Sequence, residues 1–135
     1  MDRNAYQVPF QFASEGNRIY VDVEINGHKK KAIFDTGNTA CALSFSGRSQ
    51  LTELGISVPS DARNEMHSGV SGSGNTKVFP VRKVKLGPIE RYDMDISVND
   101  SESGAEAPLL GQPFWQGWQY KIDMQRRVIE FVRRG

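Results

Sequence analysis

Two alternating segments joined by Asn-Gly limit the folds open to this chain more than any other feature of its sequence. From Ile19 to Ile25, apolar residues alternate with polar ones, the period of two that is typical of a strand with one buried face. Asn26-Gly27 follows, and both residue types accept the positive φ angles of a two-residue hairpin turn. The segment from His28 to Phe34 predicts the return strand. The sequence therefore favours an antiparallel hairpin at residues 19–34.

The rest of the chain continues this pattern of short strands and turns. Val8 to Phe12 fits a short strand at a sheet edge, because Pro9 has no N–H to donate. Gly55 is expected to end a short helix over 46–55, whereas 57–76 have the composition of a loop. We expect further strands at 40–45, 77–86, 89–98 and 108–110, a single helical turn after 110, and a second hairpin that pairs 120–122 with 128–132. Short strands with little helix predict an all-β sandwich or barrel.

Length and composition narrow the possible functions. The 135 residues, with 13 Gly and 6 Pro, suit one compact domain over 1–135. A net charge of +1 gives no reason to expect a nucleic-acid partner, and we interpret Lys29–Lys31 as a solvated strand edge. Cys41 is the only cysteine and is expected to be buried, and the two histidines are far apart in sequence, so we expect no metal site. Asp93 and Asp95 alternate on one strand face and are expected to be exposed.

One triplet, Asp35-Thr36-Gly37, carries candidate chemistry. It follows the apolar end of the strand expected at 28–34, so its carboxylate emerges from a hydrophobic base into a turn that Gly37 permits. Surroundings of low dielectric raise a carboxylate's pKa, and nearby donors fix its orientation. The same triplet is common in ordinary turns. Alone, it does not distinguish a catalytic loop from a structural one.

The segments around the triplet make it more specific. The run from 19 to 44 resembles the N-terminal half of a retropepsin-like (clan AA) aspartic protease: a hairpin, an apolar-apolar-Asp-Thr-Gly segment and a small-apolar strand ending in Leu-Ser. Leu109-Leu110-Gly111 is similar to the family's second element, and the Gly-rich segment 67–76 occupies the interval of its flap hairpin. The resemblance, to the bacterial single-domain type, covers about 18–132. It implies a closed β-barrel lobe with a flap and one or two short helices.

The resemblance also implies a function, an aspartic endopeptidase that hydrolyses peptide bonds of a polypeptide with no metal or organic cofactor. The chain has a single Asp-Thr-Gly, so the second carboxylate would come from Asp35 of another copy. The implied assembly is a homodimer that pairs through the active-site loops and terminal strands. Asn38 departs from the family, which usually has a small residue there. The implied site residues are Asp35, Thr36 and Gly37 as the catalytic loop, Leu110 and Gly111 as its support, and Asn38, Gly69, Val70 and Gly72 as substrate contacts, with the residue at the flap tip left open.

Two alternatives stay open at this stage. A retropepsin-like module can be catalytically silent or self-processing, with dimerisation or peptide binding as its task. An unrelated β-barrel binding domain could also carry Asp-Thr-Gly as a plain turn. Bacterial relatives are commonly exported or membrane-anchored, so the resemblance favours a periplasmic or membrane-anchored mature domain, with the cytoplasm as the alternative.

Overall fold

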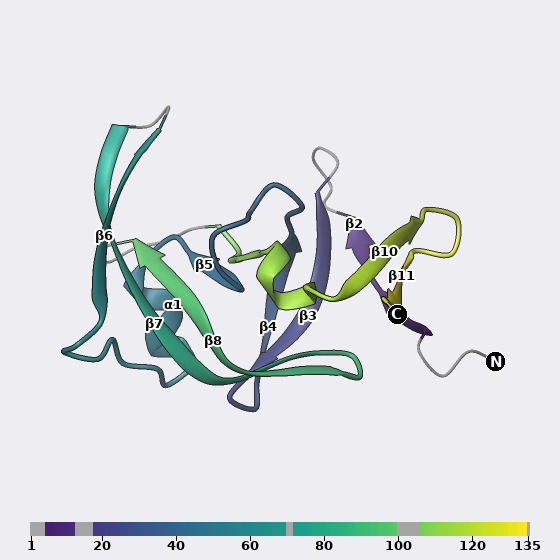
Figure 1. The fold of residues 1–135 in the computed structure, drawn as a ribbon, viewed down its shortest axis with the longest axis horizontal. Helices are drawn as coiled ribbons and strands as arrows, with labels where there is room; N and C mark the ends of the chain where they lie inside the picture. Colours follow the sequence, from purple (N-terminus) through teal and green to yellow (C-terminus); the bar gives the residue numbers. More distant parts are fainter. Residues whose placement is uncertain (1–4, 13–17, 70–71, 100–105, 135) are drawn as a thin grey trace.

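The computed structural model describes residues 5–12, 18–69, 72–99 and 106–134, with the backbone alone between 66 and 74. Strands dominate it (Figure 1). In chain order the elements are β1 (Ala5–Pro9), β2 (Gln11–Phe12), β3 (Ile19–Ile25), β4 (His28–Phe34), β5 (Leu43–Phe45), α1 (Arg48–Glu53), β6 (Arg63–Gly69), β7 (Gly72–Leu86), β8 (Ile89–Asn99), β9 (Leu109–Leu110), the 3₁₀ helix η1 (Gln112–Trp115), β10 (Trp118–Asp123) and β11 (Val128–Arg133).

The larger of two sheets closes into a barrel. Its strand order is β2-β3-β4-β9-β5-β8-β7-β6, and an additional pairing joins β3 to β7. In that pairing Glu24 lies opposite Lys85 and Ile25 opposite Val84. The strands from β3 round to β7 therefore form a closed ring, and the β6–β7 hairpin extends beyond it (Figure 1). The expected all-β fold with a closed barrel is confirmed.

A smaller sheet, ordered β1-β11-β10, joins the two ends of the described chain. β11 lies in the middle and pairs antiparallel with both neighbours. Pro9 is the last residue of the edge strand β1, where its missing N–H costs no sheet hydrogen bond. In Figure 1 this sheet lies at the opposite end of the molecule from the β6–β7 hairpin.

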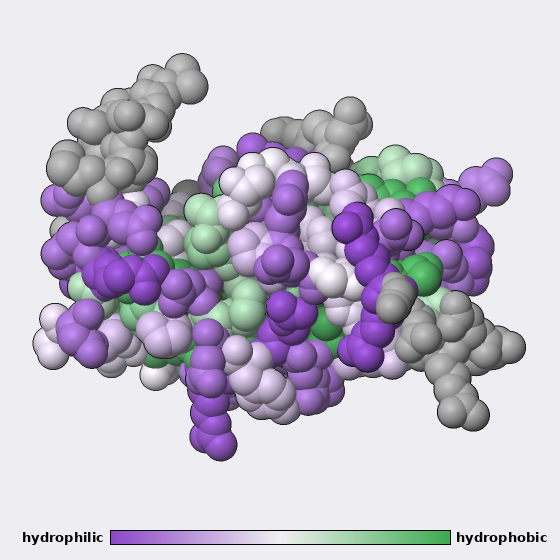
Figure 2. Space-filling model, viewed as in Figure 1, coloured by the Kyte–Doolittle hydropathy of each residue, from purple (hydrophilic) through white to green (hydrophobic). Residues whose placement is uncertain are grey.

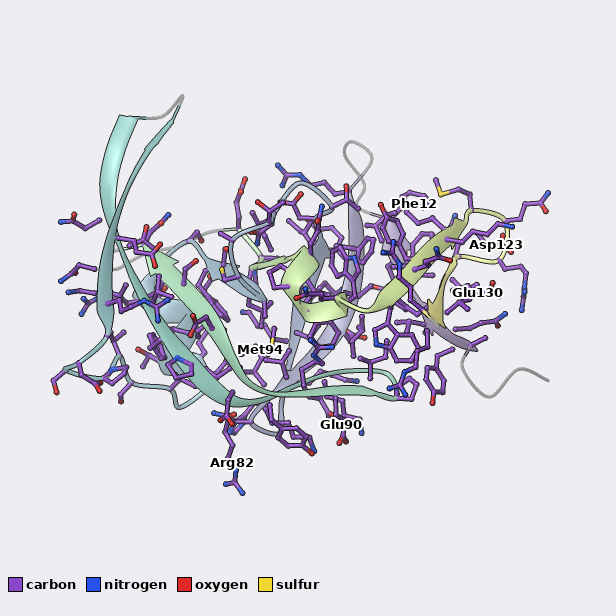
Figure 3. The ribbon with its side chains drawn as sticks, viewed as in Figure 1. Phe12, Arg82, Glu90, Met94, Asp123 and Glu130 are labelled. Atoms are coloured by element: carbon purple, nitrogen blue, oxygen red, sulfur yellow. The ribbon has the colours of Figure 1, made fainter. Side chains whose placement is uncertain are left out.

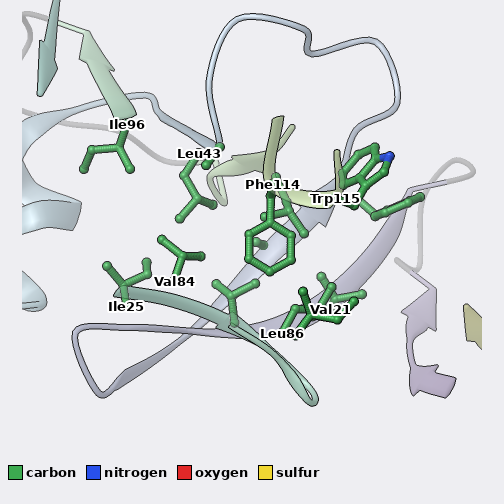
Figure 4. Close-up of a cluster of buried hydrophobic side chains, with 14 of the residues drawn as sticks. Val21, Ile25, Leu43, Val84, Leu86, Ile96, Phe114 and Trp115 are labelled. Atoms are coloured by element: carbon green, nitrogen blue, oxygen red, sulfur yellow. The ribbon is translucent and has the colours of Figure 1, made fainter. Parts of the chain in front are cut away.

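Aliphatic and aromatic side chains fill the core. Phe114, on η1, is fully buried and lies among Val21, Leu43 and Leu86 (Figure 4). Burying such a side chain contributes roughly 1.5–3 kcal/mol relative to leaving it exposed. On the face seen in Figure 2, hydrophilic side chains predominate and apolar ones show through between them. η1 is thus anchored from inside the barrel, which fixes the chain on both sides of it.

The alternation and turn chemistry of the sequence predicted most elements correctly. The hairpin at 19–34 is confirmed, with Asn26 and Gly27 at φ angles of 50° and 87°. Gly55, at φ 71°, follows the short helix as expected. The C-terminal hairpin is confirmed and is longer than predicted.

Three predictions were wrong in extent. The single strand expected from Val8 to Phe12 is two strands in different sheets, β1 and β2. The segment 57–76 is not a loop throughout, because β6 and the start of β7 pair from Arg63 opposite Val78 to Gly69 opposite Gly72. Backbone hydrogen bonds form this ladder whatever the side chains are, so a Gly- and Ser-rich composition did not reveal it. The strand expected at 40–45 begins only at Leu43, because the preceding residues belong to a hydrogen-bonded loop. No helix in the described part of the chain is long and apolar enough to cross a membrane.

Candidate active site

Asp35 stands at the end of β4, where buried strand gives way to a turn. Phe34, the last residue of β4, is buried, and β4 runs parallel to β9 with Phe34 opposite Leu110. The next backbone group continues this pairing, since the Asp35 N–H donates to the Leu110 carbonyl at 3.0 Å. Leu110 itself is fully buried. The Asp35 backbone is therefore fixed by the barrel, while its side chain is half-buried.

The turn after Asp35 holds the carboxylate. The Gly37 N–H donates to Asp35 Oδ1 at 2.9 Å, and the Asn38 N–H donates to the Asp35 carbonyl at 3.2 Å. Thr36 and Gly37 are exposed. A hydrogen bond from a backbone amide within the same turn orients one carboxylate oxygen without a second side chain.

Asn38 faces into the protein. Its Nδ2 donates to Ser44 Oγ at 3.1 Å and to the Leu109 carbonyl at 3.5 Å, and its Oδ1 accepts from the Ala40 N–H at 3.2 Å. The amide therefore joins the loop to β5 and β9. A contact between Asn38 and substrate stays a prediction.

Position 111 requires glycine because there is no room for a Cβ atom. Its φ of −106° is open to any residue, but a Cβ there would lie 2.3 Å from the Cys41 carbonyl oxygen and 2.7 Å from Asn38 Nδ2. Its N–H donates to the Ala42 carbonyl at 2.8 Å. Gly111 thus lets the chain after β9 approach the loop that follows Asp35.

Gln112 is a site residue that the sequence reasoning missed. Its side-chain Nε2 donates to the Thr36 carbonyl, and its backbone N–H donates to the Asn38 carbonyl at 2.8 Å. One residue therefore holds the Asp35 turn at two points. Its place directly after Leu-Leu-Gly was the available signal, although nothing in a single sequence shows that its side chain reaches back 76 positions.

The candidate flap residues lie in a different element. Gly69 and Gly72 face each other at the end of the β6–β7 hairpin, and Val70 lies outside the described residues. The Gly-rich hairpin that the resemblance implied is therefore present. The residues brought together around the loop are Asp35, Thr36, Gly37, Asn38, Leu110 and Gly111, with Ser44 and Gln112 added by the structure.

A cavity of about 220 Å³ lies between this loop region and the stem of the β6–β7 hairpin; Ala40, Cys41, Arg63, Glu65, Thr76, Val78 and Ser97 line it. Cys41 is buried as expected. Asp93 is exposed as expected, whereas Asp95 is half-buried and bonded to Arg63 at 2.9 Å. Within the described residues, no group of three or more His, Cys, Asp or Glu side chains is arranged to hold a metal ion.

Comparison with known proteins agrees with this geometry. The fold is that of a retropepsin-like protease: a crystal structure of a retropepsin-like aspartic protease from Rickettsia conorii superposes with a TM-score of 0.71 at 14% identity, over 96% of this chain and 92% of that one. The family model described as "gag-polyprotein putative aspartyl protease" matches residues 21–116. The chain belongs to this aspartyl protease family. No curated protein matches the sequence closely enough to add a relative of known function.

Proposed function

We propose that this chain is an aspartic endopeptidase that works as a homodimer, with Asp35 of each copy facing the other across a twofold axis. The proposal rests on the way the barrel and the turn fix Asp35. The carboxylate stands half-buried at the end of a barrel strand, with its backbone N–H bonded to Leu110 and one oxygen bonded to Gly37. The family supports an aspartic protease in general. The residues and the assembly are the proposal.

The reaction follows from two carboxylates at close range. Two such groups cannot both ionise cheaply, so they share one proton, and the titration belongs to the pair. The ionised Asp35 takes a proton from a water molecule, which attacks the carbon of the scissile carbonyl. The protonated Asp35 donates a hydrogen bond to the carbonyl oxygen as negative charge develops there. Collapse of the tetrahedral intermediate breaks the C–N bond, and the amine leaves with a proton from the pair.

The turn contacts support the same role. A carboxylate that must alternate between proton donor and acceptor needs a fixed position more than a strong counter-charge. Hydrogen bonds from the Gly37 amide to Asp35 and from Gln112 to Thr36 supply position without a formal positive charge. Thr36, exposed in the turn, is the residue that would meet its counterpart in the second copy.

The residue assignment is tested by an isosteric change. Asp35→Asn keeps the shape of the side chain and removes its acid–base chemistry, so cleavage of an unfolded polypeptide should fall by at least about 100-fold, the usual range for a lost general base. The matched control is Asp61→Asn, the same chemical change at an exposed position outside the loop. Circular dichroism and the unfolding midpoint report whether each variant folds. Cleavage by Asp35→Asn at the wild-type rate would remove Asp35 from the mechanism.

The shared site is tested by mixing wild-type protein with the Asp35→Asn variant. If each site needs one Asp35 from each copy, random pairing at equal amounts leaves about half of the wild-type chains in active dimers, so activity per wild-type chain falls to about half. Independent monomers would keep full activity per chain. Sedimentation velocity gives the oligomeric state of the same samples. A stable dimer that cleaves nothing at any pH would favour the catalytically silent module.

A further inference from the structure

The cavity beside the Asp35 loop offers a place for a substrate side chain. Ala40 and Cys41, on one wall, belong to the segment that leaves the Asp35 turn, and the Ala40 N–H is bonded to Asn38 of that turn. The opposite wall is the stem of the β6–β7 hairpin. The Ala42 N–H donates to the Asp95 carbonyl at 3.0 Å, which fixes the loop segment against β8. The cavity therefore adjoins the segment that follows the Asp35 turn, and the candidate flap hairpin forms its other wall.

Its size suits one long side chain. A volume of about 220 Å³ equals that of about seven water molecules at ~30 Å³ each. A side chain of four to seven heavy atoms, the size of Met, Lys or Arg, fills such a space. Ala40, Val78 and the buried Cys41 give it an apolar lining suited to methylene groups, with the hydroxyls of Thr76 and Ser97 beside them.

Charge is concentrated at the exposed side of the cavity, on Arg63 and Glu65. The Arg63 Nη2 lies 2.9 Å from Asp95 Oδ2 and 3.5 Å from Glu65 Oε2. The hydrogen bond to Asp95 raises the pKa of Arg63, so this guanidinium stays charged. One positive and two negative groups leave this cluster with a net charge of −1.

The arrangement distinguishes the two signs of substrate charge. Arg63 is already engaged by the shorter contact to Asp95, so an incoming carboxylate would have to displace that partner and would approach Glu65 as well. An incoming cation instead meets the carboxylate of Glu65, whose contact to Arg63 is the longer one. Long cationic side chains commonly lay their methylene groups on apolar walls and keep the charged end near water.

We propose that this cavity selects substrates with a lysine or arginine side chain at one position beside the scissile bond, with Glu65 as the residue that sets the preference. The inference rests on the proposed function. Because the charges are exposed, the expected effect is modest. Lysine gains an attraction to Glu65 and glutamate meets a repulsion from it, and the two contributions together should make lysine exceed glutamate by about threefold or more.

The test uses peptides that carry a statine unit in place of the scissile bond, with lysine, norleucine or glutamate placed at one position at a time on each side of it. Dissociation constants are measured by calorimetry on the full chain. At one position, the lysine peptide should bind about threefold or more tightly than the glutamate peptide, with norleucine between them. Glu65→Gln should bring the lysine and norleucine peptides to within twofold of each other. Arg63→Met, which leaves two carboxylates, should widen the preference for lysine.

Glu90→Gln is the matched control. It removes the same carboxylate charge from β8, but near Lys83 and Lys85, seven residues along the strand from Ser97 and away from β6 (Figure 3). Its peptide preferences should equal those of the wild type. Equal binding of all three peptides at every position, or a glutamate preference, would overturn the inference and leave the proposed function standing. Failure of every statine peptide to bind, together with no cleavage, would overturn both.

Discussion

Substituting Gly111 with alanine tests how the barrel supports the Asp35 loop. A Cβ at this position would lie 2.3 Å from the Cys41 carbonyl oxygen, whereas ordinary contact begins at 3.4 Å. The backbone must therefore separate by about 1.1 Å. A shift of that size breaks the bond from the Gly111 N–H to Ala42 and weakens the bond from the Gln112 N–H to Asn38, both 2.8 Å long.

The expected cost follows from these two contributions. Overpacking of a tight site costs about 1–3 kcal/mol, and each lost hydrogen bond adds about 1 kcal/mol. We expect Gly111→Ala to lower the free energy of unfolding by about 3 kcal/mol, which for a chain of this size lowers the thermal midpoint by roughly 10 °C. The cleavage rate should fall even at temperatures where the variant is fully folded, because the displaced backbone groups hold the Asp35 turn.

Differential scanning calorimetry measures the thermal midpoint. Peptide cleavage, assayed below the lowered midpoint, measures the loss of activity. Gly27→Ala is the matched control: Gly27 has φ 87° and a Cβ there would meet nothing within 4 Å, so only backbone strain of about 1 kcal/mol is expected, with no loss of cleavage. Wild-type melting and cleavage in Gly111→Ala would refute the reasoning.

Two further predictions concern single side chains. Gln112→Ala removes the side-chain bond to the Thr36 carbonyl, so it should cost about 1 kcal/mol of stability and lower kcat more than it changes KM. Gln112→Glu turns a carboxylate toward that carbonyl and should lower both stability and kcat further than alanine does. Urea unfolding and steady-state kinetics measure the two effects. Hydrogen bonds from Tyr92 and Lys83 lower the pKa of Glu90, so its contribution to stability is present at neutral pH and is lost as pH falls through that lowered pKa. Glu90→Gln should therefore flatten the acid side of a plot of urea midpoint against pH. An unchanged slope would contradict the assignment.

The sequence predicted those parts of the fold that local chemistry specifies. The alternation at 19–25 records which face is buried, and Asn26-Gly27 specifies the turn that follows, so this hairpin could be placed without any tertiary information. The Gly- and Ser-rich segment before Thr76 shows no apolar–polar alternation of this kind. Its strands are specified by the backbone pairing of β6 with β7, so its composition predicted a loop.

The candidate site divides in the same way. Asp35, Gly37 and Gly111 could be selected by residue type and motif order, because their roles depend on chemistry or on the absence of a side chain. The roles of Asn38 and Gln112 depend on where polar side chains point after the barrel has closed. Asn38 bonds to Ser44 and Gln112 to Thr36, and neither contact leaves a periodicity or spacing that one sequence displays.

The small sheet has a consequence for the order of folding and assembly. β1 and β10 both pair with β11 of the same chain, so within the described residues the central strand of that sheet has its neighbours before a second copy arrives. In the proposed homodimer each subunit would therefore fold before it pairs, and dilution would lower cleavage by separating folded halves rather than by unfolding them.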